Sequence, residues 1–125
     1  MKPTDPPRTP EGFLEGSGLG IAVFERVRGL LPDADVRVTR SQIAFRQRRA
    51  FAWLWRPRRW LGRRAAEIVL SVGLPRRDAS LRWKEVVQPT PRLWMHHLEL
   101  GSADEVDDEV AGWLREAADH AANTA

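Results

Sequence analysis

The spacing of apolar residues changes twice along this 125-residue chain, and that change constrains the fold more than any other feature. Between residues 19 and 31, apolar side chains recur every three or four positions, as on one face of a helix. Between residues 35 and 56 they alternate with other residues, as in strands that bury one face. Helical spacing returns after residue 102. The order helix, strands, helix is typical of an antiparallel α+β domain rather than an alternating parallel one.

Three short strands are expected within residues 35–56, because three successive runs alternate with period two. Further strands are expected over residues 68–74, 83–87 and 93–100, which are separated by turns containing Gly or Pro. We therefore predict one antiparallel sheet of about five or six strands, packed against an N-terminal and a C-terminal helix.

Both helices carry sequence signals for their beginning. Ser17 is expected to cap the first helix. Ser102 and Glu105 have the spacing of a capping box, in which the serine hydroxyl accepts a backbone N–H and the glutamate reaches back to the cap. The apolar face that follows includes Trp113 and predicts a helix of about five turns that docks on the sheet.

The length and the composition of the chain fit one domain. Residues 1–11 contain four prolines and are predicted to be a flexible leader before a single α+β domain over residues 12–122. No apolar stretch resembles a signal peptide or a membrane span, so we expect a cytoplasmic protein without a membrane span. The chain has no cysteine, which excludes disulfides and thiolate chemistry.

Charge is unevenly distributed along the sequence. Residues 35–100 carry 15 basic and 5 acidic side chains, whereas residues 101–125 carry 1 basic and 7 acidic ones. A basic block of this kind can bind a polyanion, but an acidic terminal helix can equally neutralise it within the fold.

Residues 46–64 interleave aromatic side chains with arginines. This mixture occurs in proteins that bind single-stranded nucleic acid, and it also suits an anionic membrane surface. The alternative is that the aromatic residues are simply core, with the arginines in solvent.

The register of a predicted hairpin decides between these interpretations. A three-residue loop at residues 48–50 places Trp53 and Trp55 on the core face with Phe45, and Arg46 on the other face. A two-residue Arg-Arg loop places the tryptophans on the face of Arg46 instead. We expect the three-residue loop, because arginine adopts the positive φ of a two-residue loop with difficulty. Trp53 and Trp55 are then predicted to be largely buried.

Few residues suggest catalysis or metal binding. His96 and His97 are adjacent on a predicted strand, so their side chains point to opposite faces and cannot both reach one ion. The glycine-rich segment 16–20 lacks the spacing of a nucleotide-binding loop. We expect neither a metal nor a cofactor.

Five motifs follow one another in a fixed order, at residues 36–45, 51–57, 82–87, 94–98 and 102–117. Together they resemble a small bacterial family known as domain of unknown function 5655. The resemblance spans about residues 12–121 and implies the fold class given above, but no activity. This chain has Arg40 where members commonly have Lys, and Ala118 where they commonly have Tyr.

We expect a non-enzymatic binding or interaction module whose arginine-rich sheet suits an anionic ligand or partner. One alternative is an enzyme that acts on a small anionic substrate with Arg, Lys and His groups near one end of the sheet. Another is a homodimer formed through an exposed strand edge or a tryptophan face. Nucleic acid is not the favoured partner, because the whole chain retains a net charge of only +3. The candidate ligand-binding residues are Arg40, Arg46, Arg56, Lys84, His96 and His97.

Overall fold

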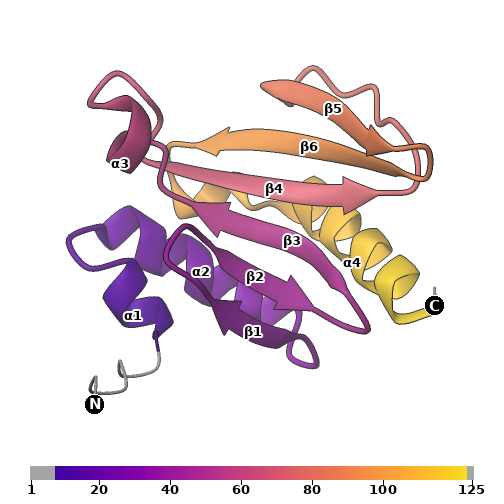
Figure 1. Cartoon of the computed structure of the whole chain (residues 1–125), viewed down its shortest axis with the longest axis horizontal. Helices are drawn as coiled ribbons and strands as arrows, with labels where there is room; N and C mark the ends of the chain where they lie inside the picture. Colours follow the sequence, from indigo (N-terminus) through magenta and orange to yellow (C-terminus); the bar gives the residue numbers. More distant parts are fainter. Residues whose placement is uncertain (1–7, 124–125) are drawn as a thin grey trace, which may run out of the picture.

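A computed structural model describes residues 8–123 of the chain. The strands are β1 (Asp35–Val38), β2 (Ile43–Arg46), β3 (Ala50–Trp55), β4 (Ile68–Leu74), β5 (Glu85–Thr90) and β6 (Leu93–Leu100). The helices are α1 (Pro10–Phe13), α2 (Gly18–Leu30), α3 (Arg58–Leu61) and α4 (Asp108–Asn123), with a 3₁₀ turn η1 (Ala103–Glu105). The strands form one antiparallel sheet in the order β1-β2-β3-β4-β6-β5, with α2 and α4 behind it in Figure 1. The predicted α+β architecture is confirmed.

The core lies between these two helices and one face of the sheet. Phe45, Leu54 and Leu70 on that face are 0% exposed. The ring centroid of Phe24 on α2 lies 5.9 Å from that of Phe45. Trp113 of α4 is buried as well and therefore docks the last helix, as the apolar spacing predicted.

The first helices begin at side-chain caps. Ser17 Oγ accepts the backbone N–H of Gly20 at 2.9 Å, so the predicted cap of α2 is confirmed. Residues 1–7 of the predicted leader lie outside the described residues. Helical structure begins within the remainder of that leader, at Pro10, because Thr9 Oγ1 accepts the N–H of Gly12 and caps α1.

The predicted capping box of the last helix is wrong. Ser102 makes no side-chain cap bond; it precedes the 3₁₀ turn instead. Glu105 does reach back, but its Oε1 accepts from the N–H of Gly101. The cap of α4 is Asp107, whose Oδ1 accepts the N–H of Val110 at 3.1 Å. The helix accordingly begins several residues later than the sequence pattern predicts.

The predicted hairpin register is also wrong, and Trp53 and Trp55 are not core residues. Trp53 pairs with Ala44, and Phe45 pairs with Ala52. Because side chains alternate along a strand, both tryptophans lie on the sheet face opposite to Phe45. Each is only partly buried.

A bulge explains this register. The loop consists of residues 47–49, and the pairing shifts between Phe45 and Arg46, so that Arg46 lies opposite Ala50. The bulge inserts one extra residue into the ladder, Phe51, which has no partner on β2 and is buried. No non-glycine residue among positions 8–123 has a positive φ. The loop therefore avoids the strain that argued against this register.

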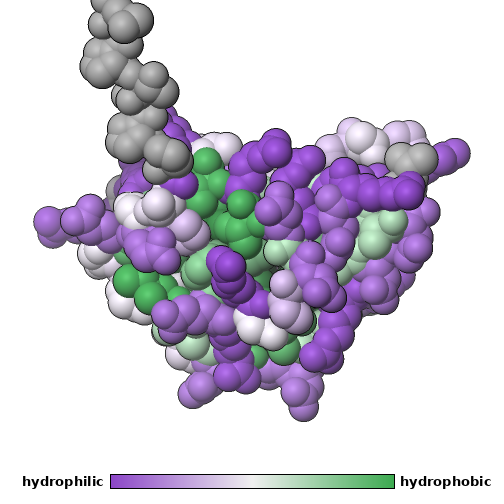
Figure 2. All heavy atoms as spheres, turned by 90° about the horizontal axis from the view of Figure 1, so that it is seen from below, coloured by the Kyte–Doolittle hydropathy of each residue, from purple (hydrophilic) through white to green (hydrophobic). Residues whose placement is uncertain are grey.

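The outer strands and the surface below them are largely polar. β5 ends at Thr90, later than predicted, and contains Pro89, which an edge strand tolerates because its N–H side faces solvent. Figure 2 views the molecule from the edge below β1 and shows mostly hydrophilic surface around a limited apolar area. Val36 and Val38 of β1 are partly buried against the core. None of the helices within residues 8–123 has the length and apolar character needed to cross a membrane.

Candidate functional site

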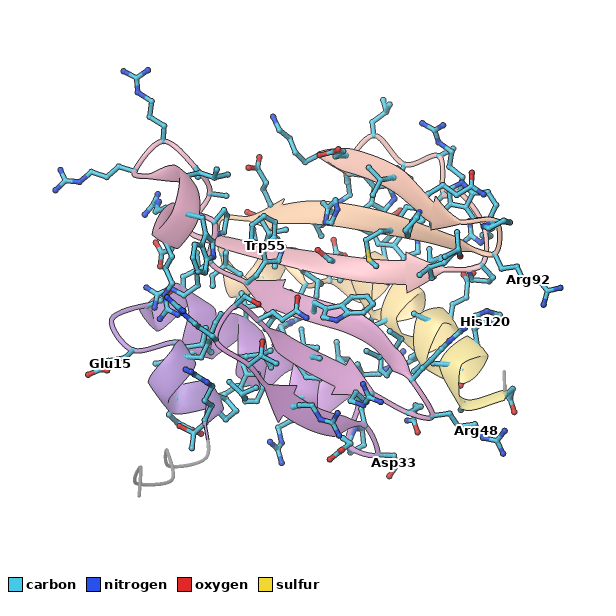
Figure 3. The ribbon with its side chains drawn as sticks, in the orientation of Figure 1. Glu15, Asp33, Arg48, Trp55, Arg92 and His120 are labelled. Carbon is cyan, nitrogen blue, oxygen red and sulfur yellow. The ribbon has the colours of Figure 1, made fainter. Side chains whose placement is uncertain are left out.

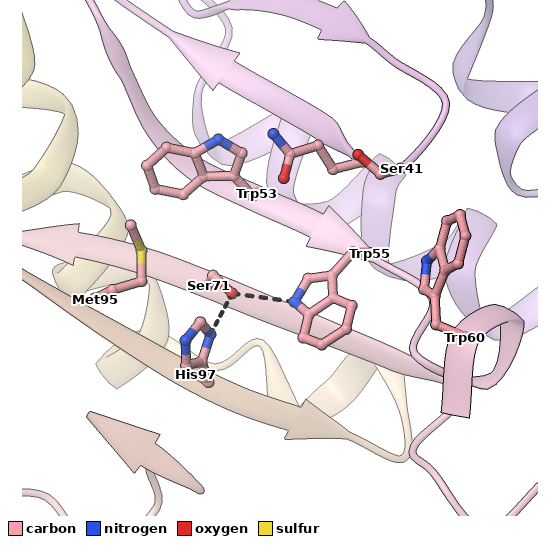
Figure 4. A pocket seen from close by; sticks show the side chains of 8 residues that line it. Ser41, Trp53, Trp55, Trp60, Ser71, Met95 and His97 are labelled. Atoms are coloured by element: carbon pink, nitrogen blue, oxygen red, sulfur yellow. Dashed lines mark hydrogen bonds between the residues drawn. The ribbon is translucent and has the colours of Figure 1, made fainter. Parts of the chain in front are cut away.

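The sheet face opposite α2 and α4 carries a pocket of about 680 Å³ (Figure 4). Strands β3, β4 and β6 form its floor, and α3 and the β1–β2 turn form its rim. This pocket, here called the tryptophan pocket, is lined by Ser41, Gln42, Trp53, Trp55, Trp60, Ser71, Met95 and His97. Three tryptophans and one methionine give it a mainly apolar wall, and a serine and a histidine place polar atoms in the floor.

The register of the sheet aligns the floor residues. Trp53 of β3 pairs with Ser71 of β4, and Ser71 pairs with His97 of β6. His97 in turn pairs with Glu85 of β5. Because paired residues point to the same face, this row lies across four neighbouring strands on the side away from α2 and α4.

A hydrogen-bond network connects three of the lining residues (Figure 4). The indole Nε1–H of Trp55 donates to Ser71 Oγ at 3.2 Å, and the same oxygen lies 2.6 Å from His97 Nδ1. Ser71 is 3% exposed. Its hydroxyl accepts from Trp55 and can give its own hydrogen to Nδ1 of a neutral His97, which leaves the imidazole hydrogen on Nε2.

The environment of His97 favours that neutral form. Burial lowers the pKa of His97 below its usual value, and the negative charge of Glu85 only partly opposes this effect. At neutral pH the imidazole is therefore uncharged, and its Nε2–H is a donor for a bound molecule.

The rim of the pocket is held by local structure. Thr39 Oγ1 accepts the backbone N–H groups of Ser41 and Gln42, each at 3.3 Å, and thereby fixes the β1–β2 turn. Trp60 lies on the four-residue helix α3, which ends at Gly62 with a φ of 85°. A positive φ of this size favours glycine.

A second hollow of about 420 Å³ adjoins the pocket, and both are lined by Trp55 and His97. Arg64, Lys84, Glu85 and Glu99 are its charged lining residues. It therefore offers two cationic and two anionic groups beside the apolar pocket. Within residues 8–123, no three acidic or histidine side chains are grouped so that they could hold a metal ion.

Of the predicted histidines, only His97 lines the pocket. His96 lies on the core face and is 0% exposed. Its Nε2 accepts the N–H of Asp78 at 2.9 Å, and its Nδ1–H donates to the Trp94 carbonyl at 3.0 Å. Burial lowers the pKa of His96, so this side chain is a neutral structural group. Lys84, another predicted residue, lines the second hollow with His97.

The three predicted arginines do not converge on the pocket. Arg56 holds α1, since its guanidinium donates to the carbonyls of Phe13 and Glu15 at 3.1 and 2.9 Å. Arg40 is exposed in the β1–β2 turn. Arg46 lies at the bulge beside the β2–β3 loop, and Figure 3 shows Arg48 of that loop at the end of the sheet away from Trp55.

A family model for a domain of unknown function, DUF5655, matches residues 21–120. The chain belongs to this family. Neither the curated proteins nor the solved structures contain a significant match to the chain. The match includes every residue that lines the tryptophan pocket, so this pocket lies wholly within the DUF5655 domain. The resemblance noted in the sequence is thus confirmed.

Sequence reasoning missed most of the pocket residues of this DUF5655 domain. Ser71 carried the most useful signal, because it is the one polar residue within the apolar run of residues 68–74. A polar residue in the middle of a buried strand needs a hydrogen-bond partner, and here it has two. Ser41 and Met95 gave no comparable signal, since only the folded chain brings them to the pocket.

Proposed function

We propose that this DUF5655 domain is a binding module that holds a small ligand in the tryptophan pocket. The ligand has a planar ring and an oxygen that accepts a hydrogen bond. The arrangement of three tryptophans around the Ser71–His97 pair carries this proposal. Indole rings offer faces and edges on which a planar ring packs well, and the Nε2–H of His97 would orient its oxygen.

An anionic oxygen, such as a carboxylate, fits best within this class. His97 supplies a donor, and Arg64 and Lys84 in the second hollow supply positive charge nearby. Glu85 and Glu99 carry an equal number of negative charges, so the ring and not the charge would provide most of the affinity. The sequence led us to expect an anionic ligand on the arginine-rich strands, and we now propose this pocket as its binding site.

Isothermal titration calorimetry with three small probes tests the proposal. Phenylacetate has a ring and an anionic oxygen, phenylacetamide has a ring and a neutral oxygen, and acetate has no ring. We expect phenylacetate to bind with a Kd on the order of millimolar, as suits a ligand of this size, phenylacetamide to bind more weakly, and acetate not to bind.

Matched variants locate the binding. Trp53→Leu and His97→Leu should each weaken phenylacetate binding about tenfold. Trp94→Leu is the control, because Trp94 pairs with Leu74 on the opposite face of the sheet. If neither ring compound binds, or if all three variants weaken binding equally, the pocket is not a ring-binding site.

An enzyme is the second candidate, favoured by the 2.6 Å between Ser71 Oγ and His97 Nδ1. Two observations give it less support: Ser71 is 3% exposed, and Trp55 donates a hydrogen bond to the oxygen that would have to attack. We expect a fluorophosphonate probe not to label the protein. Labelling that disappears in Ser71→Ala would replace the binding module with a serine hydrolase.

Other partners have weaker support. A homodimer through a sheet edge is disfavoured, because β1 has only four residues and β5 contains Pro89 and an irregular register. Sheet edges that pair with a second copy are usually long and regular. Nucleic acid is disfavoured, because Arg48 of the β2–β3 loop lies at the end of the sheet away from Trp55 (Figure 3). A cytoplasmic location remains a prediction from the sequence.

A further inference from the structure

The segment of residues 58–64 exposes apolar and cationic side chains together. Leu61 is 71% exposed and Trp60 is 54% exposed, both well above the usual range for large apolar residues. Arg58, Arg59, Arg63 and Arg64 flank them, and all four are exposed. The sequence from Val36 to Ala66 contains ten arginines and no acidic residue. The segment borders the proposed ligand site, since Trp60 lines the pocket rim and Leu61 and Arg64 line the second hollow.

We infer that residues 58–64, here called the α3 segment, dock the domain on an anionic lipid surface. Trp60 and Leu61 would enter the interfacial region, where tryptophan is favoured and leucine leaves water. Arg63 and Arg64 would contact lipid phosphates, because anionic leaflets attract basic segments. The contact would be peripheral, made by the tip of the domain.

Contacts with the rest of the fold hold this tip in place. Arg59 donates to the Phe13 carbonyl at 2.7 Å, and its guanidinium lies 4.7 Å from the centre of the Phe13 ring. Arg58 donates to the Ala65 carbonyl at 2.9 Å and lies 3.5 Å from Glu67. These two arginines therefore secure the base of the segment. A preformed tip loses little conformational entropy when it binds.

The surroundings of the segment also favour an anionic surface. Glu67 is the nearest acidic residue in the sequence, and it is engaged by Arg58 and by the hydroxyl of Ser17 at 2.7 Å. Arg40 lies at the same end, since the neighbouring Ser41 lines the pocket rim with Trp60. The opposing charges are Glu15 of the adjacent α1–α2 turn, labelled in Figure 3, and Glu85 and Glu99, which line the second hollow with Arg64.

Lipid fits the exposed side chains better than nucleic acid does. Single-stranded nucleic acid is bound by aromatic planes that lie beside cations. Leu61 is the more exposed member of the apolar pair, and it offers no plane for a base to stack on. Its burial in an acyl boundary, by contrast, removes apolar surface from water.

Vesicle co-sedimentation of the full chain tests the inference. One vesicle contains phosphatidylcholine alone, and the other contains phosphatidylcholine with about a quarter phosphatidylglycerol. We expect the protein to bind the second vesicle and not the first, with the partition coefficient falling as salt rises. Arg63→Gln/Arg64→Gln should lower that coefficient about fivefold for each arginine removed, and Leu61→Ser should also lower it.

Matched controls distinguish the segment from the overall properties of the protein. Arg77→Gln/Arg92→Gln removes the same charge from exposed positions elsewhere, and Leu81→Ser removes a leucine that is 100% exposed in another loop. These controls should bind as the parent does, and circular dichroism should show all variants folded.

Several results would overturn the inference. One is no binding to the anionic vesicle, and another is equal loss in the control variants. A third is unchanged binding in both α3-segment variants. Binding of a single-stranded oligonucleotide that depends on Arg63 and Arg64, without vesicle binding, would assign the segment to nucleic acid. None of these results depends on ligand binding at Trp53, so the proposed ligand pocket and the proposed lipid surface can be refuted separately.

Discussion

Replacing Ser71 by alanine tests the network beneath the tryptophan pocket. The hydroxyl accepts from Trp55 and is bonded to His97, so the substitution removes two hydrogen bonds. Each bond contributes about 0.5–1.5 kcal/mol net. Trp55 and His97 are only partly buried, so water can replace part of the loss. The free energy of unfolding should therefore fall by roughly 1–2 kcal/mol.

Urea denaturation measures this change, with Ser41→Ala as the control. Ser41 is exposed at the pocket rim, and its loss should cost less than about 0.5 kcal/mol. A second readout is the NMR titration of His97, whose pKa should rise in Ser71→Ala because Nδ1 loses the donor that favours neutral imidazole. Unchanged stability together with an unchanged His97 titration would refute the network.

Three further predictions concern the helices and the two histidines. Asp107→Ala should lower the free energy of unfolding, measured by chemical denaturation, by roughly 1–2 kcal/mol, because it removes the α4 cap and a partner of Arg82. Ser102→Ala should cost almost nothing, and equal costs would contradict the assigned cap. Trp113→Ala should cost roughly 3–5 kcal/mol, because its ring is buried and its centroid lies 4.2 Å from that of the tilted Trp83 ring. A cost below that of Asp107→Ala would contradict the docked helix. Burial lowers the pKa of both His96 and His97, so the unfolded chain binds more protons than the folded one below pH of about 6.5. The free energy of unfolding should therefore fall as pH decreases from about 7 to 5. A flat profile over that range would contradict the buried, neutral state of the two histidines.

The architecture could be predicted because it depends on local periodicity. The spacing of apolar residues indicates each strand and the helices α2 and α4, and one buried face then sets their common packing. The short helices α1 and α3 were not predicted, and the start of α4 was predicted too early. Ser102 and Asp107 are both good cap residues, and the choice of Asp107 coincides with its ion pair to Arg82, which lies 25 positions earlier in the sequence. That contact is tertiary, so local pattern alone does not decide it.

The pocket could not be predicted from the sequence for a related reason. Loop strain correctly disfavoured a two-residue Arg-Arg turn, but a bulge near Arg46 gave a three-residue loop with the opposite facing of the strand. Bulges depend on the pairing partner as much as on the bulged strand. The row formed by Trp53, Ser71 and His97 likewise needs three strand registers at once. Sequence could single out His97 as a candidate, but it could not show that His96 faces the core.

The most direct test of the binding site uses the six tryptophans as internal reporters. Each gives one indole N–H signal in a proton–nitrogen correlation spectrum, and phenylacetate is added to the protein. We expect the signals of Trp53, Trp55 and Trp60 to shift with a common Kd, because these side chains line the pocket. The signals of Trp83 and Trp113, which are buried under the opposite face, should stay in place. Uniform small shifts of all six signals, or shifts confined to Trp83 and Trp113, would contradict a ligand site on the open face of the sheet.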